Sequence, residues 1–384
     1  MRQKVEYVKN YFKEWVLNNA DVAKEIETIY NDTFNVFVPR DYSEISKSMT
    51  FPNMNQAIQT ILYLHQRNGI ARAVFGGNTL FAHAVGSGKT YTEIASVMEY
   101  RRLGLANKPV MVVPNNKLAD YERDFRTLYP GAKILALTEA DFTAESIKET
   151  LITAATNDWD CVIIRHSSFT KIPVGIEMER RFVEEQIREA ELALTSGSDD
   201  KYGTKKLIKK IDKLKERLED LLANRVKYDM LTFEEIGFDM VVVDEAHEYK
   251  NLYVPGKLGS IKGMQVTDAD KTVDMLMKLG YVTSLHNNKR GVIFGTGTPI
   301  SNSMAELFIM TTYLRPDILE ERNIGYFDAW ARTFADVGMS TEVSPRGGFR
   351  TTERFRRFRN LPELYKLFRE FADVKLKEEL NLPI

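Results

Sequence analysis

The sequence TLFAHAVGSGKTYTEIA, at residues 79–95, runs from an apolar stretch through a glycine-rich turn into an amphipathic stretch. This order predicts a buried strand, a tight turn and a helix. The turn matches the phosphate-binding pattern GxxxxGK[ST], except that His83 stands at the first glycine position. Gly86 and Gly88 let backbone N–H groups approach an anion closely, and the positive end of the following helix favours the same anion. The stretch therefore predicts a site for nucleotide phosphates on an α/β fold.

Four further apolar runs extend this pattern into a sheet. They are VMVV at 110–113, CVII at 161–164, MVVV at 240–243 and GVIF at 291–294, and longer amphipathic segments separate them. Unbroken apolar runs are typical of parallel strands that helices cover on both faces. We therefore expect an α/β fold with a mostly parallel sheet over residues 51–315.

A charged helical stretch interrupts this rhythm at residues 171–235. Apolar residues recur there at spacings of three and four on both sides of a polar loop: Val183, Ile187, Ala190 and Leu194, then Leu207, Ile211, Leu214, Leu218 and Leu221. The two seams predict an antiparallel helical hairpin inserted into the fold. Two roles remain open, an arm that contacts nucleic acid or another subunit and a solvated hairpin, and the charge-rich composition favours the second.

The segments that flank this fold are expected to be helical. Residues 1–50 are interpreted as an N-terminal helical extension, and residues 316–384 as a helical, arginine-rich C-terminal segment. In the second, six arginines stand against the single Glu353: Arg346, Arg350, Arg354, Arg356, Arg357 and Arg359. Guanidinium groups bind phosphate and the interleaved phenylalanines can stack on bases, so DNA contact is one reading. The alternative is a helix with solvated arginines and with Phe355 and Phe358 packed inward.

Adjacent acids follow the run at 240–243, in the sequence VVVDEAH. In a nucleotide hydrolase the first acid, here Asp244, holds Mg²⁺, and the second, Glu245, polarises the attacking water. Lys89 would place a charge on the β- and γ-phosphates, and Thr90 would offer a hydroxyl to Mg²⁺. Acids at a strand end can also be an ordinary helix N-cap.

The run at 291–294 leads into the turn GTGTP. The hydroxyls of Thr296 and Thr298 suit a loop that bonds to the acidic motif and senses the γ-phosphate. A plain turn is the alternative.

Composition excludes several classes of protein. The 384 residues include 53 Lys and Arg against 54 Asp and Glu, so no basic field covers the whole molecule. Cys161 is the only cysteine, and the five histidines lack zinc-ligand spacing, which argues against multi-cysteine metal sites and zinc hydrolases. Neither a secretory signal nor a membrane-spanning run is present, so we expect a cytoplasmic protein without a membrane partner.

These motifs, in this order, resemble the first RecA-like lobe of the superfamily-two helicases and translocases, and most closely its Swi/Snf-type branch. That branch reads DEAH followed by a basic residue and a Lys-Asn pair, which is similar to DEAHEYKN at 244–251. Its next motif, TGTPxxN followed by Glu-Leu, is similar to residues 296–302 with Glu306 and Leu307. Its loop reads DEMGLGKT, from which this chain departs at His83 and Ala84.

The resemblance implies a RecA-like P-loop NTPase lobe that uses ATP and Mg²⁺. The implied catalytic residues are Lys89, Asp244, Glu245 and His247, with Thr90 and Asp244 at the metal. The implied nucleotide contacts are Gln56, as the glutamine that reads adenine, and Val85, Gly86, Ser87, Gly88, Lys89 and Thr90. His247 would couple this site to Thr296 and Thr298.

The resemblance also implies DNA, in duplex form, as the partner. The VVP motif of the family contacts a nucleic-acid backbone and corresponds here to Pro114, Asn115 and Lys117, while the arginine-rich segment adds Arg346, Arg350, Arg356 and Arg357. Swi/Snf relatives typically move along duplex DNA without separating its strands, which favours a translocase over a strict helicase.

Three further stretches, LGLANKP at 103–109, LYPGAKIL at 128–135 and FADV at 371–374, resemble the helicase part of helicase and adenine-methylase polyproteins of phages and conjugative elements. We therefore expect a motor lobe from a mobile element or a restriction-modification-type system, with a second RecA-like lobe and an adenine-methylase domain as partners outside this chain. The alternative is a catalytically incomplete module that binds nucleotide and DNA and needs the second lobe for turnover. A P-loop kinase or a transporter ATPase is a third possibility, but the chain lacks an LSGGQ-like signature and carries the DEAH and TGTP motifs.

Overall fold

The computed structural model describes residues 8, 11–12, 14–16, 18–34, 40–195, 201–223, 230–252, 270–301, 304–343 and 349–380. The chain divides into two compact units. The larger comprises residues 41–359 and 371–384, and the smaller comprises residues 1–40 and 360–370. The sheet and the predicted ATPase motifs belong to the larger unit.

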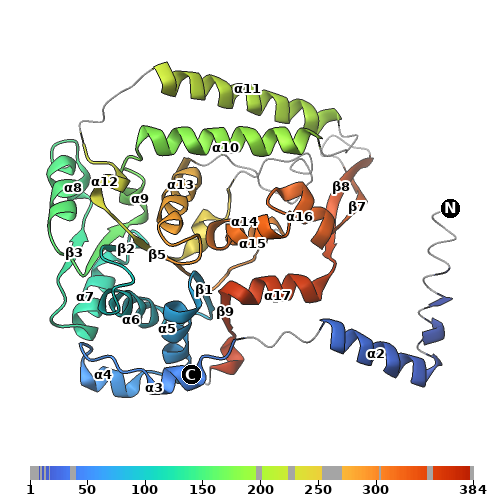
Figure 1. The fold of residues 1–384 in the computed structure, drawn as a ribbon, viewed down its shortest axis with the longest axis horizontal. Helices are drawn as coiled ribbons and strands as arrows, with labels where there is room; N and C mark the ends of the chain where they lie inside the picture. Colours follow the sequence, from blue (N-terminus) through green and yellow to red (C-terminus); the bar gives the residue numbers. More distant parts are fainter. Residues whose placement is uncertain are drawn as a thin grey trace. The chain divides into compact units, whose positions relative to one another are not determined.

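Among the described residues, seven strands form one sheet in which every neighbouring pair is parallel (Figure 1). In spatial order they are β3 (Ile134–Leu137), β4 (Cys161–Arg165), β2 (Pro109–Val113), β5 (Met240–Asp244), β6 (Val292–Gly295), β1 (Thr79–His83) and β9 (Ala372–Lys375). Every residue of β1, β2 and β6 is buried, as unbroken apolar runs predict for strands covered on both faces. The predicted α/β fold with a mostly parallel sheet is confirmed.

Helices cover both faces of this sheet (Figure 1). On one face, Ile94 of α6 shares a core with Met111 of β2 and Ile293 of β6. Successive strand residues point to opposite faces, so Phe294 points away from this core. Its ring meets Tyr313 of α14 with 5.6 Å between centroids. The helices around the sheet are α4 (Gln56–Ile61), α5 (Leu64–Gly76), α6 (Lys89–Arg102), α7 (Leu118–Leu128), α8 (Ile147–Thr156), α9 (His166–Phe169), α12 (Phe233–Ile236), α13 (Asp270–Ser284), α14 (Ala305–Leu314), α15 (Pro316–Glu321) and α16 (Phe327–Phe334).

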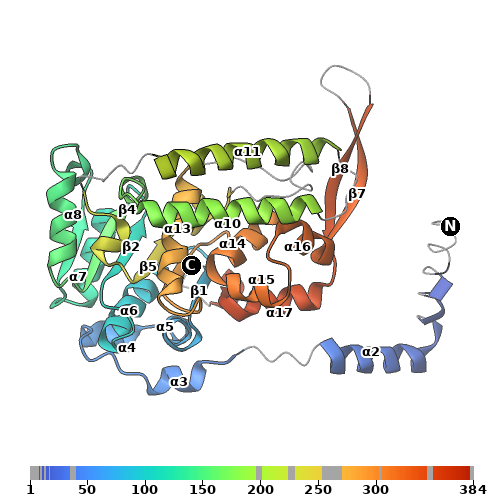
Figure 2. The same cartoon turned by 45° about the horizontal axis from the view of Figure 1, so that its top comes forward.

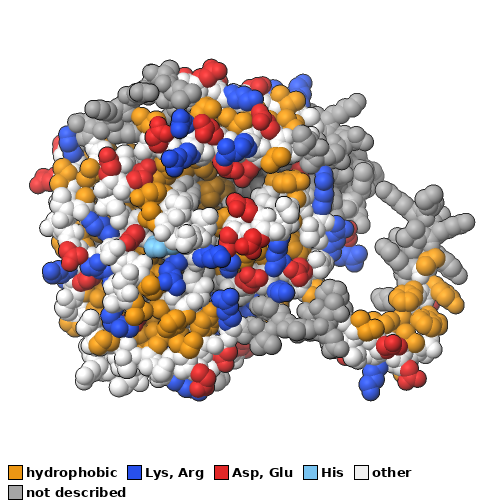
Figure 3. Space-filling model, viewed as in Figure 1, with side chains coloured by type: hydrophobic (Ala, Val, Ile, Leu, Met, Phe, Trp, Pro, Cys, Tyr) orange, Lys and Arg blue, Asp and Glu red, His pale blue; other side chains and the backbone are white. Residues whose placement is uncertain are grey.

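The predicted insertion is an antiparallel pair of helices, α10 (Ile176–Thr195) and α11 (Lys201–Ala223). The predicted seams are buried against each other: Ala190 with Leu207 and Ile211, and Val183 and Ile187 with Leu214. Lys215 also pairs with Glu191 across the hairpin at 2.9 Å. Figure 3 shows basic and acidic side chains interleaved over this region, as expected for a solvated surface.

The expectation of a helical segment over residues 316–384 is wrong for two stretches. β7 (Ala335–Val343) and β8 (Phe349–Phe358) form an antiparallel ribbon, visible at the right of Figure 2. A register shift lies between Asp336 and Val337, so Phe355 is opposite Val337 and Phe358 is opposite Ala335. Because of this bulge, two phenylalanines three residues apart face the same side of a strand, which imitates the spacing of a helical seam.

The second stretch is β9, which pairs with β1 at the edge of the sheet. The predicted lobe boundary at residue 315 therefore excluded a strand of the lobe itself. The N-terminal fifty residues contribute α2 (Ala20–Phe34) and α3 (Ser43–Ser48). The smaller unit contains α2 and nearly all of α17 (Leu361–Phe371).

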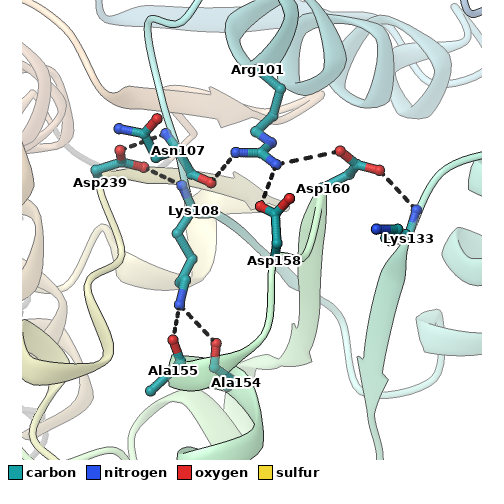
Figure 4. A network of polar contacts seen from close by, with 9 residues as sticks. All are labelled: Arg101, Asn107, Lys108, Lys133, Ala154, Ala155, Asp158, Asp160 and Asp239. Atoms are coloured by element: carbon teal, nitrogen blue, oxygen red, sulfur yellow. Dashed lines mark hydrogen bonds and ion pairs between the residues drawn. The ribbon is translucent and has the colours of Figure 1, made fainter.

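Paired polar groups fix the amino-terminal ends of four strands (Figure 4). Asp239, just before β5, accepts hydrogen bonds from the backbone N–H groups of Asn107 at 2.6 Å and Lys108 at 2.8 Å. Asp160, just before β4, accepts one from Lys133 at 2.8 Å. Arg101 at the end of α6 lies 2.8 Å from Asp158 and 3.5 Å from Asp160. The loops that lead into these four strands are thereby held to one another.

None of the helices that the structure describes is long and apolar enough to cross a membrane.

Candidate nucleotide-binding site

The predicted motifs converge where β1, β6 and β5 end side by side. In the sheet register Asp244 lies opposite Gly295, and Gly295 lies opposite Phe81. The carboxyl ends of parallel strands are where open α/β sheets bind their ligands. The predicted motifs therefore meet at the end of the sheet where such ligands bind.

The predicted phosphate-binding loop has the backbone conformation that its glycines favour. Gly86 and Gly88 have φ angles of 84° and 77°, a region that other residues avoid. A Cβ on Gly88 would also lie 2.3 Å from Nε2 of Gln66. α6 begins directly after Gly88, so its free N–H groups face the loop. Lys89 donates to the carbonyl oxygens of His83 at 3.0 Å and Ala84 at 3.4 Å.

A cavity of about 460 Å³ joins the loop to the acidic motif. It brings together five predicted loop residues and both predicted acids: Val85, Gly86, Gly88, Lys89 and Thr90, with Asp244 and Glu245. Its remaining wall comes from α7 and the residue before it: Lys117, Asp120, Tyr121, Arg123 and Asp124. Ser87, the sixth predicted loop residue, is buried behind the loop.

Three carboxylates, those of Glu93, Asp244 and Glu245, lie close together beside this cavity. Burial raises the pKa of Glu93 well above its ordinary value, and the charge of Asp244 adds to this effect. Burial likewise raises the pKa of Asp244, with a smaller contribution from Glu245. Tyr121 donates a hydrogen bond of 2.8 Å to one oxygen of Glu93. The other oxygen has no hydrogen-bond partner among the described residues.

Glu93 and Tyr121 were not predicted from the sequence, although a local signal for Glu93 exists. Glu93 follows Lys89 by four residues on α6, so both lie on the same helical face. Gly295 makes room for its carboxylate, since a Cβ there would lie 1.9 Å from the unpartnered oxygen and 3.5 Å from Asp244. Only the packing of β6 against α6 shows this requirement.

The second and third predicted motifs touch through His247. Its Nδ1 lies 3.1 Å from the hydroxyl of Thr296 and 3.1 Å from a carboxylate oxygen of Glu245. The Thr296 hydroxyl in turn accepts a hydrogen bond of 3.0 Å from the N–H of Thr298. Glu245 itself adopts a left-handed backbone with φ of 51°, an uncommon conformation for a residue other than glycine.

The structure does not bring Gln56 to the loop. Gln56 is exposed at the first residue of α4 and does not line the cavity. Gln66 lies there instead, donating to the carbonyl of Gly88 at 3.1 Å, while His65 contacts the carbonyl of Ser87 at 2.8 Å. α5 runs directly into β1, so its first turn returns to the carboxyl end of that strand. This helix-before-strand order is the signal that could have identified Gln66.

The predicted nucleic-acid contacts occupy two separate places. Asn115 and Lys117 are exposed after β2, and Lys117 also lines the cavity. Pro114 accepts a hydrogen bond from the N–H of Lys117 at 2.9 Å. On β8, the exposed Arg357 pairs with Asp336 at 3.0 Å. Arg346 lies outside the described residues, as do the side chains of Arg350 and Arg356.

The residues present suit a magnesium ion. Mg²⁺ keeps several waters and needs few protein oxygens, and Thr90 and Asp244 line the same cavity. A cation bound among them would reduce the repulsion between the carboxylates of Glu93, Asp244 and Glu245. Within the described part of the chain, no cluster of three or more His, Cys, Asp or Glu side chains has metal-binding geometry, so waters would complete the shell.

The fold and this site agree with the comparison to known families. The chain belongs to the family of probable helicase domains, which matches residues 73–376. The expected resemblance to a helicase ATP-binding lobe is thereby confirmed, and the chain is a helicase-type domain.

The individual proteins that resemble this chain share little sequence with it. The chain is 21% identical over 427 residues to the Defense against restriction protein B of Escherichia phage P1, with 99% of this chain and 18% of that protein aligned. It is also similar, at 16% identity, to the SWI2/SNF2 ATPase core domain of Sulfolobus solfataricus, covering 90% of this chain and 50% of that one with a TM-score of 0.43. The same core in complex with dsDNA gives 16% identity, 70% and 38% coverage and a TM-score of 0.35.

Proposed function

We propose that the chain is the ATP-binding and ATP-hydrolysing motor lobe of a Swi/Snf-like DNA translocase. The observation that carries this proposal is the single cavity shared by the glycine loop, Lys89 and the acids Asp244 and Glu245. A loop alone would indicate phosphate binding, whereas a loop facing two acids across a cavity provides for hydrolysis of the phosphate.

The chain's own residues would share the work as follows. The loop amides and Lys89 bind the phosphates, and Lys89 exchanges its carbonyl partners for phosphate oxygens. Thr90 and Asp244 would hold Mg²⁺, which neutralises charge on the phosphates when bound. Glu245 orients a water for in-line attack and accepts its proton.

The contact between His247 and Thr296 supports a coupling role for both residues. The same ring nitrogen of His247, Nδ1, lies 3.1 Å from Glu245 and 3.1 Å from Thr296 of the TGTP turn, so a shift of either motif reaches its neighbour. Thr298 is joined to this contact through the Thr296 hydroxyl. We assign these three residues to communication between hydrolysis and movement on DNA.

The wider setting is also a proposal. The chain spans 18% of the phage P1 relative, whose name refers to defence against restriction. We infer that the chain acts in the cytoplasm within a larger machine of a mobile element, together with a second RecA-like lobe and an adenine methylase. In this machine the second lobe would supply the arginine that stabilises the transition state.

DNA-stimulated ATPase activity tests the proposed hydrolysis. Glu245→Gln should lower the turnover rate about 10²- to 10⁴-fold because the group that accepts the proton is lost. Glu248→Gln is the matched control, since Glu248 lies on the same turn but pairs with Lys271 at 3.1 Å. Binding of nucleotide and DNA without any turnover in the wild type would instead identify a catalytically incomplete module.

The salt dependence of DNA binding tests the proposed contact at β8. Arg357→Ala should reduce the slope of log affinity against log salt by about 1, because one phosphate contact and its released counterion are lost. Arg126→Ala, which removes an exposed arginine paired with Glu122 on α7, is the control. An unchanged slope for Arg357→Ala would remove β8 from the DNA interface.

A further inference from the structure

His83 is the residue at which the loop departs from its pattern, and the proposed hydrolysis gives it no task. It ends β1 and stands where the pattern has its first glycine. Its side chain is fully buried. A buried imidazole needs a hydrogen-bond partner. The loop does not supply one, so the partner of His83 comes from another part of the fold.

That partner is Asp373 on β9, which lies 290 residues later in the chain. Nε2 of His83 lies 2.8 Å from the Oδ2 atom of Asp373. Burial is the main reason that the pKa of His83 is lowered, which favours a neutral ring. Burial alone would raise the pKa of Asp373, but the hydrogen bond with His83, together with the charges of Lys375 and Arg72, holds it below its ordinary value. Because a carboxylate can only accept, Nε2 donates this hydrogen bond, and a hydrogen bond to a charged acceptor is strong.

The backbone of the loop is attached to the same strand. The N–H of Ala84 donates to the carbonyl of Lys375 at 2.9 Å, directly after the pairing of β1 with β9 ends. The carbonyl of His83 accepts the hydrogen bond from Lys89. His83 thus joins β9 through its side chain and the phosphate-binding lysine through its main chain.

Neighbouring rings restrict the imidazole to this position. The ring centroid of Phe81 lies 5.3 Å away and that of His65 lies 6.2 Å away, edge-on. His65 also contacts the carbonyl of Ser87, so the same side chain packs on His83 and on the loop. The charged or titratable groups that face His83 are His65 of α5, Lys89 of α6 and Asp373 of β9.

We propose that the hydrogen bond between His83 and Asp373 positions the phosphate-binding loop, so that the affinity of the loop for nucleotide depends on β9. His83 would act as a positioning residue, because its side chain contacts Asp373 of β9 and not the bound nucleotide. The inference rests on the proposed nucleotide-binding function.

Two measurements on the full chain test this inference. The first is hydrogen exchange of the amides at residues 84–92, which needs no nucleotide. The second is the dissociation constant of a fluorescent ADP analogue. Asp373→Leu removes the acceptor at similar size, and His83→Phe keeps a ring among Phe81 and His65 but removes the donor.

Both variants should speed exchange in the loop and weaken ADP binding about tenfold, the equivalent of one hydrogen bond to a charged group. Asp373→Asn retains an acceptor oxygen and should stay within about threefold of the wild type. Asp274→Leu is the matched control, since it breaks another buried pair, with Lys278 at 2.7 Å on α13. It should lower the melting temperature without changing loop exchange or ADP affinity.

Unchanged loop exchange in both Asp373→Leu and His83→Phe would overturn the inference, as would an equal change in the Asp274→Leu control. If the wild type binds no ADP analogue, the proposed function fails, while loop exchange still decides whether His83 and Asp373 hold the loop. If Asp373→Leu does not fold, His83→Phe and Asp373→Asn give the same comparison.

Discussion

Charged side chains gather at both ends of the sheet, and the two ends differ in how these side chains are partnered. At the amino-terminal ends, Asp239 and Arg101 are held by N–H groups or by charges of opposite sign (Figure 4). At the carboxyl ends, the charge of Asp244 adds to burial in raising the pKa of Glu93, and the charge of Glu245 does the same for Asp244. Lys89 there donates to main-chain carbonyls. The acids beside the cavity are therefore crowded by like charges, whereas Asp239 and Arg101 at the other end of the sheet are not.

The difference indicates where a ligand is needed. Groups that find partners within the chain stabilise the fold, whereas crowded like charges cost stability and persist where a ligand completes them. Phosphate would complete Lys89 and the loop amides, and a cation would complete the acids. Mutations at the carboxyl ends of the strands should then reduce activity, whereas mutations at the amino-terminal ends should reduce stability.

The largest effect should come from Lys89→Ala. Removing the charge that faces the phosphates should reduce kcat/KM for ATP at least about 100-fold, with little change in the free energy of unfolding. DNA-stimulated ATPase assays and urea denaturation measure the two quantities. Lys108→Ala at the other end of the sheet is the control, because Lys108 donates to the carbonyl of Ala154 at 3.1 Å and should affect only stability. Full activity in Lys89→Ala would contradict the proposed site.

A smaller effect, on stability, should follow Asp239→Ala. The N–H groups of Asn107 and Lys108 lose a charged acceptor, which should lower the free energy of unfolding by about 2–3 kcal/mol. Urea denaturation gives this value. Asp158→Ala should cost less than about 1 kcal/mol because Asp158 makes an exposed ion pair. If Asp239→Ala instead weakened nucleotide binding, as is expected for Lys89→Ala, the two ends of the sheet would not have separate roles.

The smallest effect should be a gain of stability in Asp244→Asn. Because the pKa of folded Asp244 lies above its ordinary value of 3.8, folding favours the protonated form. This contribution is complete below pH 3.8 and is lost as the pH rises through the folded pKa. The neutral asparagine avoids that loss, so the variant should be slightly more stable than the wild type at pH 7, and the difference should disappear in acid.

Denaturation at both pH values measures this difference, and ATPase activity should fall in the same variant. Lower stability of Asp244→Asn at pH 7 would show that the hydrogen bonds from Tyr121 and the backbone of Glu245 outweigh burial and the charge of Glu245. The distinction between the two ends of the sheet would then be lost.

Much of the fold could be predicted because its signals are local. The run before His83, the turn with Gly86 and Gly88 and the start of α6 are adjacent in sequence, and each has one strongly favoured backbone. The seams of α10 and α11 were predicted for the same reason, since helical spacing is repeated within each helix. Leu221, the last residue of the predicted seam, has a side chain outside the described part.

The failures share a different cause. The ribbon of β7 and β8 depends on pairing between strands and on a bulge at Asp336, which the spacing of Phe355 and Phe358 concealed. β9 is too short to be distinguished from the end of α17 by its composition. Gln56 was chosen by its distance from Lys89 along the chain, whereas Gln66 is placed by the return of α5 to the loop.

The sequence by itself determined the type of each motif and the order in which the motifs follow the strands. It did so because a glycine turn, a pair of acids and a threonine turn each carry their chemistry within a few residues. Only the tertiary structure decided which side chains meet: Glu93 beneath Asp244, and His83 against Asp373. Those contacts join segments far apart in the chain, and burial at the point of contact sets their charge and strength.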